Sequence, residues 1–112
     1  MAKYMILYNS IVSARDTMAN ANPEQMKVSM EEWKQWRDEA SKVVTFEFGM
    51  PLQPVSRVTP EGVTEVDSQV SGYSTIESDS KEAVIEVLKN HPQLKRSGAT
   101  IDVLEMLSMP GM

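Results

Sequence analysis

The chain of 112 residues suits a single domain spanning residues 1–112, because one hydrophobic core typically serves about 100 to 200 residues. Its 41% apolar and 24% charged residues match an ordinary globular protein and exclude a disordered chain. The net charge of −5 and the scattered basic residues argue against a nucleic-acid partner, and the absence of Cys excludes disulfides, thiolate metal sites and a Cys nucleophile.

The first predicted element is a strand over residues 4–8, a run that is apolar at every position. Neither face of such a strand can lie in water without a free-energy cost, so we expect a central strand. The run is too short for a secretory signal and far from the roughly 20 apolar residues that span a bilayer. We therefore expect a cytoplasmic protein with no membrane partner, and the lack of Cys agrees with that location.

Residues 9–22 show no sustained hydrophobic periodicity, so we predict neither a helix nor a strand there. A long helix is predicted over residues 23–42. Asn22 can cap the first free amides, Pro23 is tolerated at the first helical position, and Gln25 can hydrogen-bond back to the cap. Apolar side chains recur at spacings of three and four, so one face should pack on a sheet. That face comprises Met26, Met30, Trp33, Trp36, Arg37 and Ala40.

Two strands flanking a hairpin are predicted in the middle of the chain. Residues 43–48 follow a period of two, and Gly49 and Pro51 should end this strand. Residues 55–66 carry two arms with Val and Thr around Pro60-Glu61-Gly62, which is typical of a hairpin. Residues 70–77 form the next strand, in which Gly72 eases a bend or lets another backbone come close.

A second helix and a last strand follow. Asp79 should cap the helix, with Glu82 three residues later, and Pro92 ends it because it disfavours the helical conformation at His91. Gly98 introduces a strand over residues 99–106, and residues 108–112 form an irregular tail. The inner face of the helix is formed by Ala83, Val84, Val87 and Leu88.

This order of elements predicts an α+β fold with a β-α-β-β-α-β plan and an inserted hairpin. Both helices then cover one face of an antiparallel sheet and leave the other face open. The first strand is apolar on both sides, and exposed apolar patches usually mark an interface. We therefore expect a homodimer that forms through the open face, with a tetramer as an alternative.

Four segments of the sequence follow one another in order along the chain. They are Lys3-Tyr4-Met5-Ile6-Leu7-Tyr8, then Ser71-Gly72-Tyr73-Ser74-Thr75-Ile76-Glu77-Ser78-Asp79-Ser80-Lys81-Glu82-Ala83, then His91-Pro92-Gln93-Leu94, and finally Met109-Pro110-Gly111-Met112. Together these segments resemble the YCII-related domain family. The likeness extends over nearly the whole length, and the order and spacing of the segments carry it. The resemblance implies a ferredoxin-like sandwich whose subunits pair into a dimeric α+β barrel, without a settled activity.

The family's proposed catalytic residues cannot be placed on this chain. Relatives carry a proposed His and Asp pair in a pocket, and one branch carries an Asp-Gly-Pro-Phe motif before the strand that begins here at Val70. This chain has Glu65-Val66-Asp67-Ser68-Gln69 in that neighbourhood, and its first helix contains no His. The resemblance therefore implies no catalytic pair.

His91 is the only histidine and a candidate pocket residue, because its ordinary pKa lies near neutrality and suits a general acid or base. It also sits at the predicted end of a helix, where a cation is favoured and the ring can bond the last free carbonyls. A structural role is therefore the alternative. Asp79 could serve as its partner, but capping already accounts for an acid at that position.

Six polar residues on three strands are the other pocket candidates. Strand alternation could bring them to one face, which would line the cavity between two subunits. Alternatively, they meet solvent or cross-strand partners. A pair such as Glu47 and Asp102 would handle protons only if both carboxylates entered the same cleft. The six are Thr45, Glu47, Tyr73, Thr75, Thr100 and Asp102.

We predict no metal and no cofactor, because the sequence shows no metal-ligand pattern, no phosphate-binding glycine loop and no Ser, His and Asp arrangement. The nine Met residues could form an adaptable binding surface, although those of the first strand and helix are explained more simply as core. Two functions remain open. One is a dimeric small-molecule-binding protein or modest enzyme with a pocket in the barrel interior, and the other is a noncatalytic interaction or regulatory module.

Overall fold

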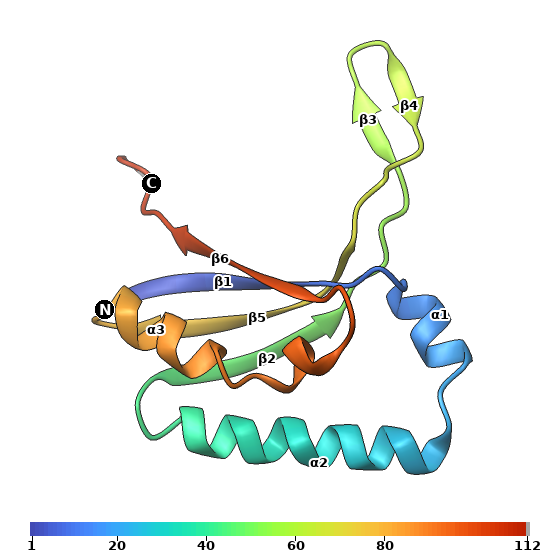
Figure 1. Ribbon diagram of the computed structural model, residues 1–112. Helices are drawn as coiled ribbons and strands as arrows, with labels where there is room; N and C mark the ends of the chain where they lie inside the picture. The colour runs from blue at the N-terminus through green and yellow to red at the C-terminus, as the bar shows by residue number, and fades with distance from the viewer. Residues whose placement is uncertain (112) are drawn as a thin grey trace.

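The computed structural model describes residues 1–111 and contains a four-stranded antiparallel sheet with helices beside it (Figure 1). The sheet order is β2-β5-β1-β6, formed by β1 (Ala2–Asn9), β2 (Thr45–Pro51), β5 (Val70–Ser78) and β6 (Thr100–Met106). The helices are α1 (Ala14–Ala19), α2 (Pro23–Ala40) and α3 (Lys81–Leu88), and a short 3₁₀ turn, η1 (Pro92–Lys95), follows them. A separate hairpin consists of β3 (Arg57–Thr59) and β4 (Gly62–Thr64). The prediction of an α+β fold is confirmed.

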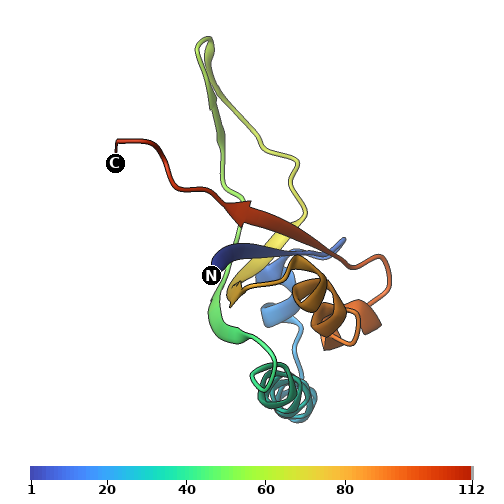
Figure 2. The ribbon, with the colours of Figure 1, turned by 90° about the vertical axis from the view of Figure 1, so that its left-hand side faces the viewer.

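Strand β1 lies inside the sheet, paired with β5 on one side and with β6 on the other, as its apolar run predicts. Tyr4, Ile6 and Tyr8 are buried in the core between sheet and helices, whereas Met5 and Leu7 point to the opposite face and are only partly covered. The second apolar face of this strand is therefore the one that no helix of the described residues covers (Figure 2).

The core fills the space between the sheet, the C-terminal half of α2, and α3. The indole Nε1 of Trp36 donates a hydrogen bond to the carbonyl oxygen of Val87 at 2.8 Å, which ties α2 to α3. Ile6, Ile76 and Val84 are fully buried at the centre. The core consists of Tyr4, Ile6, Tyr8, Trp36, Ala40, Val44, Phe46, Ile76, Val84 and Leu88.

The N-terminal half of α2 does not pack on the sheet, contrary to the prediction. Met26 and Met30 are 44% and 57% exposed, although they continue the stripe that contains Trp36. The predicted apolar face is core only toward the C-terminal end of the helix, where Trp33 is half-buried and Ala40 is buried. The exposed half of α2 instead forms one wall of a pocket.

Helix starts agree with the prediction at α2 and differ at α1 and α3. The Asn22 cap of α2 is confirmed, because its Oδ1 accepts a hydrogen bond from a first-turn amide at 2.8 Å. Ser13 caps the six-residue helix α1, which lies in the stretch for which we predicted no element. The prediction that Asp79 caps α3 is wrong: Ser80 Oγ accepts the first-turn amide at 3.2 Å, and Asp79 is exposed.

Strand β2 begins at Thr45, two residues later than predicted, and continues past Gly49 to Pro51 with an irregular register. A Cβ at Gly49 would lie 2.4 Å from the ring of Tyr73 on the neighbouring strand. Gly49 therefore makes room for an aromatic ring and does not stop the strand. The other boundaries lie within two residues of the prediction, except that β3 and β4 are shorter than the predicted arms.

All helices of the described residues lie on one side of the sheet, and the hairpin β3-β4 projects away from the body of the molecule (Figures 1 and 2). Val58 and Val63 of this hairpin are 79% and 69% exposed. Residues 107–111 form neither helix nor strand, as predicted for the tail, and Met112 lies outside the described residues. No helix within residues 1–111 has the length and apolarity needed to cross a membrane.

Candidate functional site

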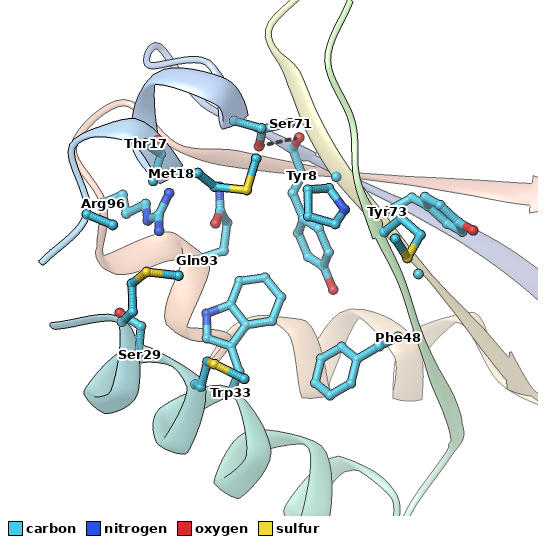
Figure 3. A pocket seen from close by; sticks show the side chains of 18 of the residues that line it. Tyr8, Thr17, Met18, Ser29, Trp33, Phe48, Ser71, Tyr73, Gln93 and Arg96 are labelled. Atoms are coloured by element: carbon cyan, nitrogen blue, oxygen red, sulfur yellow. Dashed lines mark hydrogen bonds between the residues drawn. The ribbon is translucent and has the colours of Figure 1, made fainter. Parts of the chain in front are cut away.

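A pocket of about 540 Å³ opens between the helices and the sheet, and its volume lies in the usual range of small-molecule sites (Figure 3). The lining residues belong to the C-terminal end of β1, to α1, α2 and η1 with the residues that directly follow α1 and η1, to the C-terminal part of β2 and to the N-terminal part of β5. These segments are far apart in the sequence, so only the folded chain contains the pocket. It lies on the side of the sheet that carries the helices.

Apolar side chains form most of the pocket wall. Trp33 of α2 and Phe48 of β2 lie side by side in it, with their ring centroids 6.0 Å apart. Four methionines complete the wall, namely Met18, Met26, Met30 and Met50. These methionines are 44% to 65% exposed, so interpreting the helix methionines as core is wrong. These methionines fit the interpretation as an adaptable binding surface better, because unbranched thioether side chains can follow the shape of a bound molecule.

Tyr8 and Ser74 form a buried polar pair at the base of the pocket. The Tyr8 hydroxyl donates a hydrogen bond to Ser74 Oγ at 2.7 Å, and burial raises the pKa of Tyr8 to about 12. The phenol therefore stays neutral near pH 7 and keeps the proton that it donates. The hydroxyl of Ser71, another lining residue, donates to the Tyr8 carbonyl oxygen at 3.2 Å. These bonds hold the polar groups of the base in one arrangement.

Arg96 is the only charged side chain among the described residues that line the pocket. It follows η1, is exposed, and makes no salt bridge within residues 1–111. Gln93 precedes it in η1 and donates a hydrogen bond from Nε2 to the Asn9 carbonyl oxygen at 3.3 Å. In Figure 3, Arg96 and Gln93 lie at the end of the pocket remote from Phe48. The pocket thus has a basic end and an aromatic end.

His91 lies behind the pocket wall and is not one of the lining residues. Its ring centroid is 4.5 Å from that of Trp33, 4.9 Å from that of Tyr8 and 4.2 Å from that of Trp36. Its Nδ1 accepts a hydrogen bond from the Gln93 amide at 2.9 Å and so caps η1. Burial among these groups lowers the pKa of His91 to about 4, so the imidazole is neutral near pH 7.

The structural role of His91 differs from the predicted one. Helix α3 ends at Leu88, and the imidazole accepts a hydrogen bond at the start of η1 instead of binding the last carbonyls of α3. The expectation of a favoured cation at the helix C-terminus is wrong, because burial keeps the ring neutral. Since Nδ1 accepts, the ring proton is assigned to Nε2, which finds no hydrogen-bond partner within residues 1–111.

The six polar strand candidates share the open face of the sheet, because their positions alternate with the buried ones along each strand. Glu47 of β2 lies opposite Thr75 of β5. Asp102, however, is on β6, at the other edge of the sheet. Three strand spacings separate β2 from β6, which is about 14 Å, and Asp102 is also displaced along its strand because Glu47 lies in line with Leu104. The fold of a single chain therefore does not bring Glu47 and Asp102 together as a pair.

Three of these candidates have cross-strand partners within the same chain. Asn9 Nδ2 donates to Thr100 Oγ1 at 3.2 Å and to Asp102 Oδ2 at 3.0 Å. Tyr73 covers Gly49, and although it borders the pocket, Figure 3 shows its ring directed away from the interior. Thr100, Asp102 and Tyr73 therefore follow the alternative interpretation, in which the polar strand residues meet cross-strand partners. A cavity shared between two subunits stays a prediction.

No local sequence pattern identified the residues that distinguish the pocket. Trp33 and Met30 belong to the recognised helix stripe, but periodicity cannot separate a pocket wall from a core. Arg96 belongs to the only pair of adjacent basic residues, Lys95-Arg96, which carried no prediction of a site. The partnership of Tyr8 with Ser74 joins residues 66 positions apart, and no local pattern indicates it.

Within residues 1–111, no three His, Cys, Asp or Glu side chains gather as potential metal ligands. The resemblance to the YCII-related family stays a prediction. Comparison of the chain with protein-family models and with curated proteins found no match.

Proposed function

We propose that this protein is a homodimeric small-molecule-binding protein of the YCII-related type, with a ferredoxin-like sandwich as its subunit. The strand order β2-β5-β1-β6, with α2 and α3 packed on one face, supports that sandwich. We assign ligand binding to the pocket between the helices and the sheet. The interior between two paired sheets, where the polar residues of the open face would lie, is the alternative location.

The pocket carries this proposal. It combines a volume of about 540 Å³ with a mostly apolar wall and a few fixed polar groups, which is the usual composition of a small-molecule site. The described residues that line it include no Asp, Glu, His, Lys or Cys, so Tyr8 and Tyr73 are the only ones of the usual general acid or base types. Burial raises the pKa of Tyr8 to about 12, which makes its phenol a poor proton donor or base near pH 7. Binding is therefore the part of the function that the pocket favours.

The neutral apolar dye Nile red tests the pocket through two matched variants of α2. Met30 lines the pocket and is 57% exposed, whereas Val28 is 58% exposed on the same helix and does not line it. A carboxylate in the apolar wall should repel an apolar dye, so we expect Met30→Asp to weaken Nile red binding at least tenfold. Val28→Asp should bind like the wild type. Equal binding by all three proteins, or none by the wild type, would contradict the proposed site.

Dimerisation through the open face rests on the apolar side chains there. Met5 of β1 pairs with Leu104 of β6, and Leu104 is 45% exposed. Leu7 is partly covered, and Met106 at the end of β6 is 44% exposed. A second copy of the same face would remove these side chains from water and stabilise the assembly.

Light scattering on two charge-introducing variants tests the dimer. Leu104→Lys places a charge on the proposed interface and should give a monomer at micromolar concentration. Ile85→Lys is the control, because Ile85 has a similar exposure of 40% but lies on α3, on the helix side of the sheet. A monomeric wild type, or a dimer that Leu104→Lys leaves intact, would contradict dimerisation through this face. A wild-type mass equal to that of four chains would identify a tetramer.

The alternative, a noncatalytic interaction module, is favoured by the projecting hairpin β3-β4. Its valines Val58 and Val63 pair with each other and are largely exposed. A two-stranded hairpin is at best marginally stable alone, so a partner that covered these valines would stabilise it. The interaction-module alternative would be favoured if the α2 variants showed that Nile red does not bind in the pocket.

A further inference from the structure

We propose that the pocket selects amphipathic anions, molecules with one carboxylate and an apolar, preferably aromatic, body. This inference rests on the proposed function, since it assigns a ligand class to the same pocket. It begins from the distribution of charge, because Arg96 is the only charged residue among the described lining residues of a chain whose net charge is −5. The lining of this pocket thus contains a cation and no acid, although the protein as a whole is acidic.

The basic group and the apolar wall lie at different ends of the pocket. Figure 3 shows Arg96 near Thr17 and Gln93, well away from the ring of Phe48. Trp33 and Phe48 supply the aromatic end. A ligand that fills such a pocket needs an apolar end and a polar end, and the polar end must suit a guanidinium group.

A carboxylate suits this end for a geometric and an electrostatic reason. The guanidinium group presents donors in a planar fork that matches the two oxygens of a carboxylate. Arg96 makes no salt bridge within residues 1–111, so binding a ligand would break no existing ion pair in that part of the chain. An ammonium group would meet repulsion from Arg96 and no compensating acid in the described lining.

The size of the preference follows from the exposure of Arg96. An exposed ion pair is worth less than a buried one, because water and salt screen both charges. We therefore expect the carboxylate to bind about three- to tenfold more tightly than a neutral amide of the same shape. Added salt should reduce this preference without reducing the binding of the amide to the same extent.

Arg37 provides a second cation against which the assignment can be tested. It lines a smaller neighbouring hollow of about 330 Å³ that shares Met30, Trp33 and Phe48 with the main pocket. Its guanidinium carbon lies 5.5 Å from the centre of the Phe48 ring, and a nitrogen lies 3.4 Å from Asp38 Oδ1. Arg37 is therefore already engaged, and we assign the anion to Arg96.

The experiment compares three naphthalene compounds with the same ring: naphthylacetate, naphthylacetamide and naphthylethylamine. Calorimetric titration of the full chain near neutral pH and at low salt gives the dissociation constants. For the wild type we expect the acetate to bind three- to tenfold more tightly than the amide, and the amine most weakly. In Arg96→Gln the acetate should fall to the level of the amide, while the amide binds as in the wild type.

Arg37→Gln is the matched control, because it removes the same charge beside the same wall and should keep the preference for the acetate. Equal binding of acetate and amide to the wild type would overturn the inference, and so would a preference that survives Arg96→Gln. Loss of the preference in Arg37→Gln alone would overturn the assignment to Arg96. If no naphthalene compound binds while Nile red binds at the Met30 site, the ligand class is wrong and the proposed function stands.

Discussion

We predict that His91 makes the stability of this protein depend on pH between its folded and unfolded pKa values. Burial lowers the pKa of His91 to about 4 in the folded chain, whereas an unfolded histidine titrates near about 6.5. Between these values the unfolded chain binds a proton that the folded chain does not. The free energy of unfolding therefore falls as the pH decreases, by about 2 kcal/mol at about pH 5 and about 3 kcal/mol at about pH 4 relative to neutral pH.

His91→Asn isolates this contribution. Asn removes the titrating group, and its side-chain oxygen can still accept the Gln93 amide, as Nδ1 of His91 does. The measurement is urea unfolding followed by tryptophan fluorescence, at one protein concentration, from neutral pH to about pH 4. The carboxylates titrate in both proteins and cancel in the difference between them. We expect the stability advantage of the wild type over His91→Asn to shrink by about 3 kcal/mol across this range.

Parallel pH curves for the two proteins would refute the reasoning. A direct control is available because His91 is the only histidine, so its ring protons give a single set of histidine signals in a proton NMR titration. Signals that titrate near the ordinary histidine pKa would show that the three surrounding aromatic rings do not exclude water from the imidazole.

Three further predictions concern the stability of the fold. Ser80→Ala should lower the free energy of unfolding by about 1 kcal/mol because it removes the cap of α3, while Asp79→Ala should change it little; urea unfolding compares the two. Tyr8→Phe leaves the buried hydroxyl of Ser74 without its partner and should cost about 1–3 kcal/mol by the same assay, and an unchanged stability would count against a buried polar pair. Gly49→Ala would place a Cβ 2.4 Å from an aromatic ring and should lower the Tm, since overpacking typically costs about 1–3 kcal/mol; an unchanged Tm would mean that the ring moves freely.

Local patterns determine much of this fold because periodicity and capping act over a few residues. The wholly apolar run from Tyr4 to Tyr8 can be satisfied only inside a sheet, and β1 does lie between β5 and β6. The Asn22 cap and the apolar stripe at helical spacing predicted the position of α2. Alternation alone placed the polar strand residues on one face, since side chains of a strand point alternately to its two sides.

The pocket depends on contacts between distant segments, and only the tertiary structure decides those. Met30 and Trp36 belong to one helical stripe, yet the first lines a pocket and the second lies in the core, because α3 and the sheet approach only the C-terminal half of α2. His91 is neutral because aromatic rings from β1 and α2 enclose it. Arg96 borders the pocket because η1 brings it there. Residue type and spacing determined which elements form, whereas burial and charge at the site were decided by how those elements pack.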